Sequence, residues 1–124
     1  MSVAALRLED SDGGAGRFVG AEWSTRGDWV SCSVPGQGVV STYVEGEETD
    51  QPAPLSRDTF GKTAWATWTG TSFAAPQITG AISLTMQQDG WTGTPMDAFR
   101  TVLADGAEVL RAEGFGTSIS ILPV

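Results

Sequence analysis

The sequence predicts an α/β fold. Two observations support this: four short apolar stretches of strand length are separated by glycine- and proline-bearing turns, and two segments of helix length follow them, at residues 72–88 and 94–104. Hydrophobic residues make up 40% of the 124 residues and charged residues 18%. The chain therefore has the composition of a globular domain with a real core and not that of a disordered segment.

The first part of the chain predicts strands joined by turns. Residues 1–8 are apolar and compatible with a strand, and residues 9–16 are rich in turn formers. Residues 29–34 are the second strand candidate, because apolar residues alternate there. Pro35-Gly36 predicts a turn, and residues 39–44 predict a third short strand.

An acidic, proline-bearing surface loop is expected at about 45–59, since carboxylates and prolines interrupt the apolar pattern there. Residues 60–69 alternate apolar residues again and predict a strand or one arm of a hairpin. Residues 116–124 predict a weak terminal strand.

The two helix predictions have different characters. Residues 72–88 are apolar on nearly all faces in their first half, which predicts a buried helix, and Asp89-Gly90 supplies a stop. The helix at 94–104 has a clear start, because Thr94 is a candidate N-cap and Pro95 takes the first helical position.

Within the stretch Gly70 to Gly80, a serine lies in a small, glycine-flanked turn (the serine turn), and an apolar run of helix length begins immediately after it. This turn presents the Ser72 hydroxyl and its own N–H at a helix N-terminus, where an oxyanion can be stabilised. Pro76 fits the same picture, because a proline in the first turn of a helix gives up an N–H that would be unpaired anyway. Gly80 would allow close packing against a neighbouring element. The alternative interpretation is a small-residue turn that only caps a buried helix.

The segment Gly70-Thr71-Ser72-Phe73-Ala74-Ala75-Pro76-Gln77-Ile78-Thr79-Gly80 resembles the serine motif of subtilisin-like serine peptidases (subtilases), Gly-Thr-Ser-x-Ala/Ser-x-Pro followed by a small residue and a glycine. Residues 23–42 are similar to a segment that precedes this motif in subtilases. The matching residues there are Trp23, Ser24, Gly27, Val30, Pro35, Gly36, Val39, Ser41 and Thr42. The motif departs at Phe73 and Gln77, where the family often has methionine and histidine.

The resemblance runs from about Val3 to Leu103. It implies that residues 1–124 are the C-terminal part of a subtilase catalytic domain: a partial α/β/α sandwich with a mostly parallel sheet, its N-terminal half absent. It also implies a serine-type endopeptidase in which Ser72 attacks polypeptide substrates and forms an acyl-enzyme. The Ser72 N–H would donate to the oxyanion, and Gly70, Thr71 and Pro76 would support the turn.

The sequence contains no histidine. A serine hydroxyl is a weak nucleophile until a base takes its proton, and in the triad that base is a histidine oriented by a carboxylate. In subtilases the catalytic aspartate and histidine precede the serine, and the residues before Ser72 match neither. We therefore expect the chain alone to be inactive, and a complementary chain carrying both groups would be needed.

Two other functions stay open on the sequence. One is a non-catalytic remnant that binds peptides or pairs with another chain. The other is a different serine hydrolase built on a nucleophile elbow. The second is disfavoured because Ala74 stands where that motif needs glycine, and because no histidine follows the serine.

Composition excludes some partners. The net charge is -8 and basic residues are few and scattered, which argues against nucleic-acid binding, and no apolar run is long enough to span a membrane. Cys32 is expected to be a small core residue. No cofactor is implied with certainty. Many subtilases bind calcium at loops, but the acidic loop at 45–59 matches no loop signature and is better explained as solvated.

The family is largely secreted, but the N-terminus shows no signal-peptide pattern, so the compartment stays open. Met1 would open the chain inside or just before a core strand, which points to a fragment or a truncated reading frame.

Overall fold

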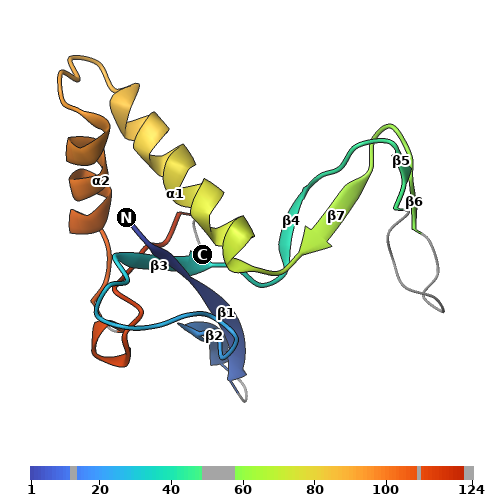
Figure 1. Ribbon diagram of the computed structural model, residues 1–124, viewed down its shortest axis with the longest axis horizontal. Coiled ribbons are helices and arrows are strands. Elements are labelled where there is room, and N and C mark those ends of the chain that lie inside the picture. Colours follow the sequence, from blue (N-terminus) through green and yellow to red (C-terminus); the bar gives the residue numbers. More distant parts are fainter. Residues whose placement is uncertain (12–13, 49–57, 109, 122–124) are drawn as a thin grey trace.

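The computed structural model describes residues 1–11, 14–48, 58–108 and 110–121 (Figure 1). The body of the molecule contains a sheet with strand order β2-β1-β3-β8. Strand β1 (Val3–Ser11) pairs antiparallel with β2 (Gly14–Gly20) and parallel with β3 (Cys32–Pro35), and β3 pairs parallel with β8 (Thr117–Ser118). The sheet is thus mostly parallel, which confirms the predicted α/β class.

The stretch predicted as a turn at 9–16 is partly strand. β1 and β2 form a hairpin in which Leu6 lies opposite Gly20 and Glu9 opposite Arg17, with a bulge between Glu9 and Ser11. Arg17 Nη2 lies 2.8 Å from Glu9 Oε2, and this hydrogen bond lowers the pKa of the Glu9 carboxyl. Cross-strand pairing therefore extends the two strands into residues 9–16, where the local composition had predicted a turn.

Side chains alternate between the two faces of the sheet, as strand geometry requires. On one face, Ala4 and Leu6 pack with residues on either side of the short 3-10 helix η1 (Arg111–Glu113). On the other face, Ala5 packs under the helices. The buried cluster on that helical face consists of Ala5, Ala21, Cys32, Val34, Ala74, Ile78, Phe99, Val102 and Ile119.

Helices α1 (Thr71–Met86) and α2 (Pro95–Ala104) lie over the same face of the sheet (Figure 1). The prediction that the first helix is buried is wrong, because only Ala74, Ile78 and Thr85 of α1 are buried, and Leu84 is 70% exposed. The described residues cover α1 mainly where it meets the sheet and α2, and Trp68 of the arm also packs on Phe73 in its first turn. No described atom outside the helix would lie within 4 Å of a Cβ placed at Gly80, so the close packing predicted there is absent.

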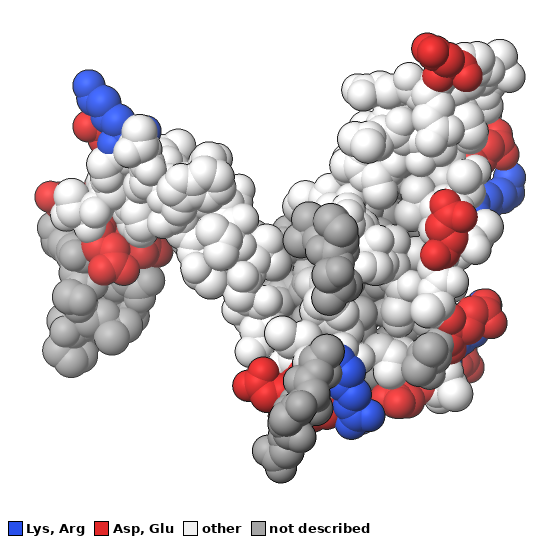
Figure 2. Space-filling view, turned by 180° about the vertical axis from the view of Figure 1, so that it is seen from behind, with Lys and Arg blue, Asp and Glu red and all other residues white. Residues whose placement is uncertain are grey.

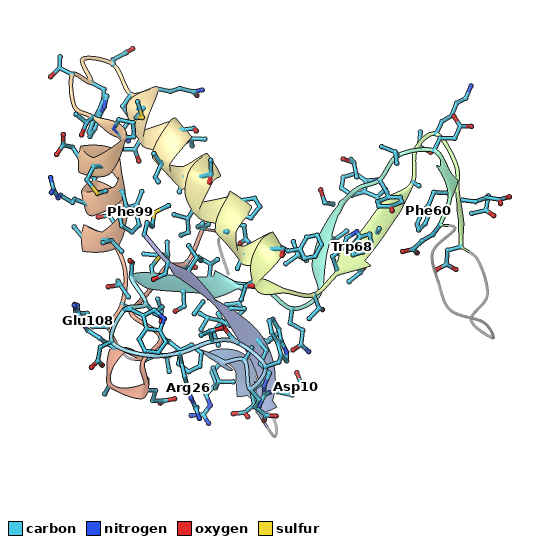
Figure 3. All side chains as sticks on the ribbon, viewed as in Figure 1. Asp10, Arg26, Phe60, Trp68, Phe99 and Glu108 are labelled. Atoms are coloured by element: carbon cyan, nitrogen blue, oxygen red, sulfur yellow. The ribbon has the colours of Figure 1, made fainter. Side chains whose placement is uncertain are left out.

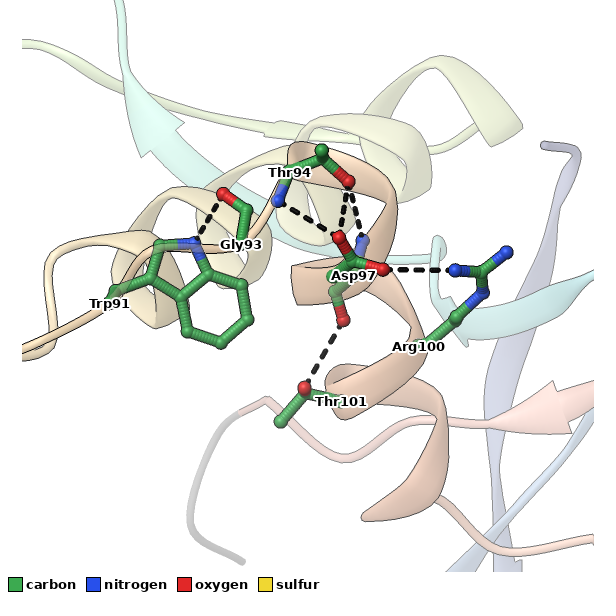
Figure 4. A network of polar contacts seen from close by, with 6 residues as sticks. All are labelled: Trp91, Gly93, Thr94, Asp97, Arg100 and Thr101. Carbon is green, nitrogen blue, oxygen red and sulfur yellow. Dashed lines mark hydrogen bonds and ion pairs between the residues drawn. The ribbon is translucent and has the colours of Figure 1, made fainter.

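Helix α2 begins as the sequence predicted (Figure 4). The Thr94 hydroxyl accepts a hydrogen bond from the Asp97 N–H, and the Asp97 carboxylate accepts one from the Thr94 N–H at 3.0 Å. This capping box satisfies N–H groups that the helix itself leaves free. Hydrogen bonding from Thr94 also lowers the pKa of the Asp97 carboxyl. In the described part of the chain, neither helix is long and apolar enough to cross a membrane.

A hairpin arm projects from the body, beyond the first turn of α1 (Figure 1). Strand β4 (Val39–Thr42) pairs antiparallel with β7 (Trp65–Trp68), and the short strands β5 (Gly46–Glu47) and β6 (Thr59–Phe60) pair farther out. The acidic loop predicted at 45–59 is therefore strand at its described ends, and residues 49–57 lie outside the described residues. Seen from behind, the surface between arm and body is uncharged (Figure 2).

A row of aromatic side chains runs along the arm into α1. Phe60 packs on Tyr43 with ring centroids 4.3 Å apart, Tyr43 on Trp68 at 5.5 Å, and Trp68 on Phe73 at 5.3 Å. Figure 3 shows Trp68 near the base of the arm and Phe60 toward its far end. Because Phe73 follows Ser72 directly, this row joins the arm to the serine turn.

Candidate active site

The serine turn depends on a backbone conformation that only glycine adopts readily. Gly70 is the N-cap of α1 with φ 155° and ψ 159°, a region that is essentially restricted to glycine. The Gly70 N–H donates to the carbonyl of Gly36 at 2.8 Å, which ties the turn to the end of β3. A Cβ added at Gly36 would lie 2.6 Å from the Ala5 Cβ, so the close approach requires glycine there too.

Ser72 is the second residue of α1, and its side chain is exposed. No side chain caps this helix end, and no acidic residue lies in its first turn. Free N–H groups and the positive end of the helix dipole therefore face the space around the hydroxyl. This arrangement can stabilise an oxyanion formed on a carbonyl that the hydroxyl attacks.

Within the described residues, the Ser72 hydroxyl makes no hydrogen bond. The whole sequence contains no histidine. The structure thus brings Gly70, Thr71 and Ser72 together at the start of α1 and places Pro76 farther along the same helix, but the chain supplies no histidine as the proton acceptor that a serine nucleophile requires.

Pro76 lies deeper in the helix than predicted. With α1 starting at Thr71, Pro76 is an interior residue. Its missing N–H would have paired with the carbonyl four residues earlier, which is that of Ser72. The reason given for Pro76 from the sequence is therefore wrong. The proline removes a helix hydrogen bond from the Ser72 carbonyl, so the first turn depends more on contacts outside the helix.

A hollow of about 500 Å³ lies beside the first turn of α1. It is bordered by residues 39–43 of the arm and by Trp68, Phe73 and Pro76. The lining is largely apolar, with the hydroxyls of Ser41 and Thr42 at its edge. An apolar side chain of a bound peptide would be desolvated there, close to the serine.

Other candidate groups do not join this site. Burial raises the pKa of the Cys32 thiol to about 11, so the thiol stays protonated at neutral pH, in line with its predicted core role. Among the described residues, no group of three or more acidic, cysteine or histidine side chains could hold a metal ion. The calcium prediction concerns a loop mostly outside those residues and stays a prediction.

A family model for the subtilases, Peptidase S8, matches residues 17–116, a span that includes the serine motif. The chain belongs to the subtilase family. Among solved structures it is similar to fervidolysin from Fervidobacterium pennivorans, a keratinolytic enzyme related to subtilisin, with a TM-score of 0.62 and 28% sequence identity. The match covers 96% of this chain but 18% of fervidolysin. No curated protein matches the chain.

The family match confirms the resemblance predicted from the motif and the mostly parallel sheet of a partial subtilisin-like fold. It also places the chain at family level among the serine peptidases. Sequence reasoning assigned no structural role to Gln77, which lies in α1 close to the serine turn. The Gln77 side chain bridges α1 and β3, which residue spacing alone could not reveal.

Proposed function

We propose that this chain carries the nucleophile of a serine endopeptidase, Ser72. The observation that carries the proposal is the exposed Ser72 hydroxyl at an uncapped helix N-terminus in a subtilase serine motif. The hydroxyl oxygen attacks the carbonyl carbon of a peptide bond, its proton passes to a base, and the amine leaves with a proton from that base. Water then hydrolyses the resulting acyl-enzyme.

The neighbouring residues have supporting roles in this proposal. The Ser72 N–H faces the developing oxyanion, and Gly70 provides the backbone conformation that starts the helix there. Thr71 opens the helix, and Pro76 leaves the Ser72 carbonyl without its helix partner. The hollow beside Phe73 receives part of the polypeptide substrate.

The base has to come from a polypeptide segment outside this sequence, because the chain has no histidine. In subtilisin itself, loss of the catalytic histidine lowers turnover about two million-fold, or roughly 8–9 kcal/mol of barrier. An effect of that size separates an efficient peptidase from one whose turnover is very hard to detect. The proposal therefore includes a complementary segment that carries the histidine and the aspartate.

The test combines the purified chain with the N-terminal part of a subtilase catalytic domain that carries both residues. A fluorophosphonate probe, located by mass spectrometry, and hydrolysis of a fluorogenic peptide are the two readouts. We expect labelling and hydrolysis only in the mixture, and their loss in Ser72→Ala. The matched control is Ser83→Ala, which changes another exposed serine of α1. Labelling that persists in Ser72→Ala would contradict the proposal.

A non-catalytic, partner-binding role is the second candidate, and one observation favours it. An apolar groove of about 640 Å³ lies between α1 and the base of the arm, bordered by Val39, Val40, Ala81, Leu84 and Ile121. Apolar surface of this kind is usually covered by another polypeptide. A complex that forms with the complementary segment but leaves Ser72 unlabelled would favour this role over catalysis.

A further inference from the structure

The amide of Gln77 connects the serine helix to the sheet. Its Nε2 donates to the carbonyl of Pro35, the last residue of β3, at 2.6 Å, and to the carbonyl of Phe73 at 2.8 Å. The side chain is half-buried. One amide nitrogen has two N–H groups, so it can serve both carbonyls at once.

This bridge acts where the helix is weakest. Pro76 removes the hydrogen bond to the Ser72 carbonyl, so the first turn of α1 has one internal bond fewer than an ordinary helix. Among the described residues, one other hydrogen bond joins the serine turn to the end of β3, that from the Gly70 N–H to the Gly36 carbonyl. The two tethers lie before and after Ser72 in the sequence, so together they fix the turn from both sides.

We propose that Gln77 is a positioning residue for Ser72: its neutral amide links the carbonyl of Phe73, the residue after the serine, to the end of β3. The catalytic consequence rests on the proposed function, whereas the positioning itself does not. Few side chains can replace this amide. Methionine has a similar length but no donor, and a glutamate would direct acceptor oxygens at two carbonyl oxygens. A histidine retains an N–H donor.

The test starts with amide hydrogen exchange, resolved by residue, on the full chain. The reporters are the Gly70 and Phe73 N–H groups, which are hydrogen-bonded to Gly36 and Gly70. In Gln77→Met we expect about fivefold faster exchange at both, the effect of losing the hydrogen bond that joins this side chain to β3, and a larger increase in Gln77→Glu. Gln77→His should recover part of the protection. A purely structural role would instead accelerate exchange throughout α2 as well.

Ser83→Ala is the matched control, because the Ser83 hydroxyl also bonds to a backbone carbonyl of α1 but makes no bond to β3. Its exchange at Gly70 and Phe73 should equal that of the unchanged chain. Equal exchange in Gln77→Met and the unchanged chain would overturn the proposal, and so would acceleration that spreads equally to α2.

Fluorophosphonate labelling with the complementary segment separates this inference from the proposed function. In Gln77→Met the maximal labelling rate should fall several-fold, while the probe concentration at half-maximal rate stays the same. An unchanged maximal rate would overturn a catalytic contribution of Gln77 even if Ser72 is the nucleophile. If the unchanged chain is never labelled, but amide exchange at Gly70 and Phe73 is faster in Gln77→Met than in the unchanged chain, the proposed function is refuted and the positioning role is supported.

Discussion

Replacing Gly70 by alanine should destabilise the chain through backbone conformation alone. Gly70 has φ 155° and ψ 159°, and forcing a residue with a Cβ into such a region costs about 1–3 kcal/mol. The cost is not steric crowding by neighbours, because the nearest atom to an added Cβ is the Phe73 Cδ2 at 3.5 Å, an ordinary contact distance. We expect the urea midpoint of unfolding to fall, and the melting temperature to fall by several degrees.

Gly80 provides the opposite case on the same helix. An added Cβ there meets no atom outside the helix within 4 Å, and alanine in a helix interior is favoured over glycine by roughly 0.5–1 kcal/mol. Gly80→Ala should therefore raise the urea midpoint. Both substitutions add one methyl group, one at the N-cap of α1 and one in its interior, and the two effects together predict a difference of about 1.5–4 kcal/mol between the variants. The reasoning is refuted if the two variants unfold at the same urea concentration.

Three further predictions concern other parts of the molecule. Thr94→Ala removes the capping box of α2 and should destabilise the chain by about 1 kcal/mol in urea unfolding. Hydrogen bonding from Thr94 lowers the pKa of the Asp97 carboxyl in the folded state, which stabilises the fold above the ordinary pKa of 3.8 and less so as the pH falls. The stability of Thr94→Ala should therefore depend less on pH in the acid range than that of the unchanged chain. Burial raises the pKa of the Cys32 thiol from 9.0 to about 11, so the thiol ionises at lower pH in the unfolded chain than in the folded one. The urea midpoint should therefore decrease as the pH rises from about 9 toward 11. A midpoint that does not change over this range would show that the thiol is not buried. Trp68→Ala removes the ring that packs on Tyr43 and Phe73. The near-ultraviolet circular dichroism signal of the aromatic side chains should become weaker, while the far-ultraviolet signal of the helices stays the same.

Local chemistry made much of the fold predictable. Thr94 and Pro95 marked the start of α2 because capping and the fixed φ of proline act within a few residues. The strand at β3 was recognisable because apolar and polar residues alternate there, but it runs from Cys32 to Pro35, so the predicted start at residue 29 was wrong and Pro35 belongs to the strand and not to the turn after it. Effects that act through distant partners were missed. Arg17 extends the first hairpin by pairing with Glu9 across it, and no property of residues 9–16 taken alone specifies that pairing.

The candidate site shows the same division. Ser72 and Gly70 were recognisable because a helix N-terminus has a local signature and the motif is specific. The burial of α1 was overestimated because apolar residues show what a helix can bury, not whether another element covers it, and Leu84 is exposed. The Gln77 bridge was not predicted because it joins residues 42 positions apart, through a contact that depends on how α1 packs on the sheet.

The base of the arm is built from the same residues that begin the serine helix. Its two strands meet the body at Gly36 and Gly38 on one side and at Gly70 on the other, joined by the bonds from Gly70 N–H to the Gly36 carbonyl and from Gly38 N–H to the Thr69 hydroxyl. Gly70 therefore has two places in the structure: it starts α1 beside Ser72, and it is where the arm rejoins the body. A substitution that changes the backbone conformation of Gly70 is expected to alter the serine turn and the orientation of the arm together.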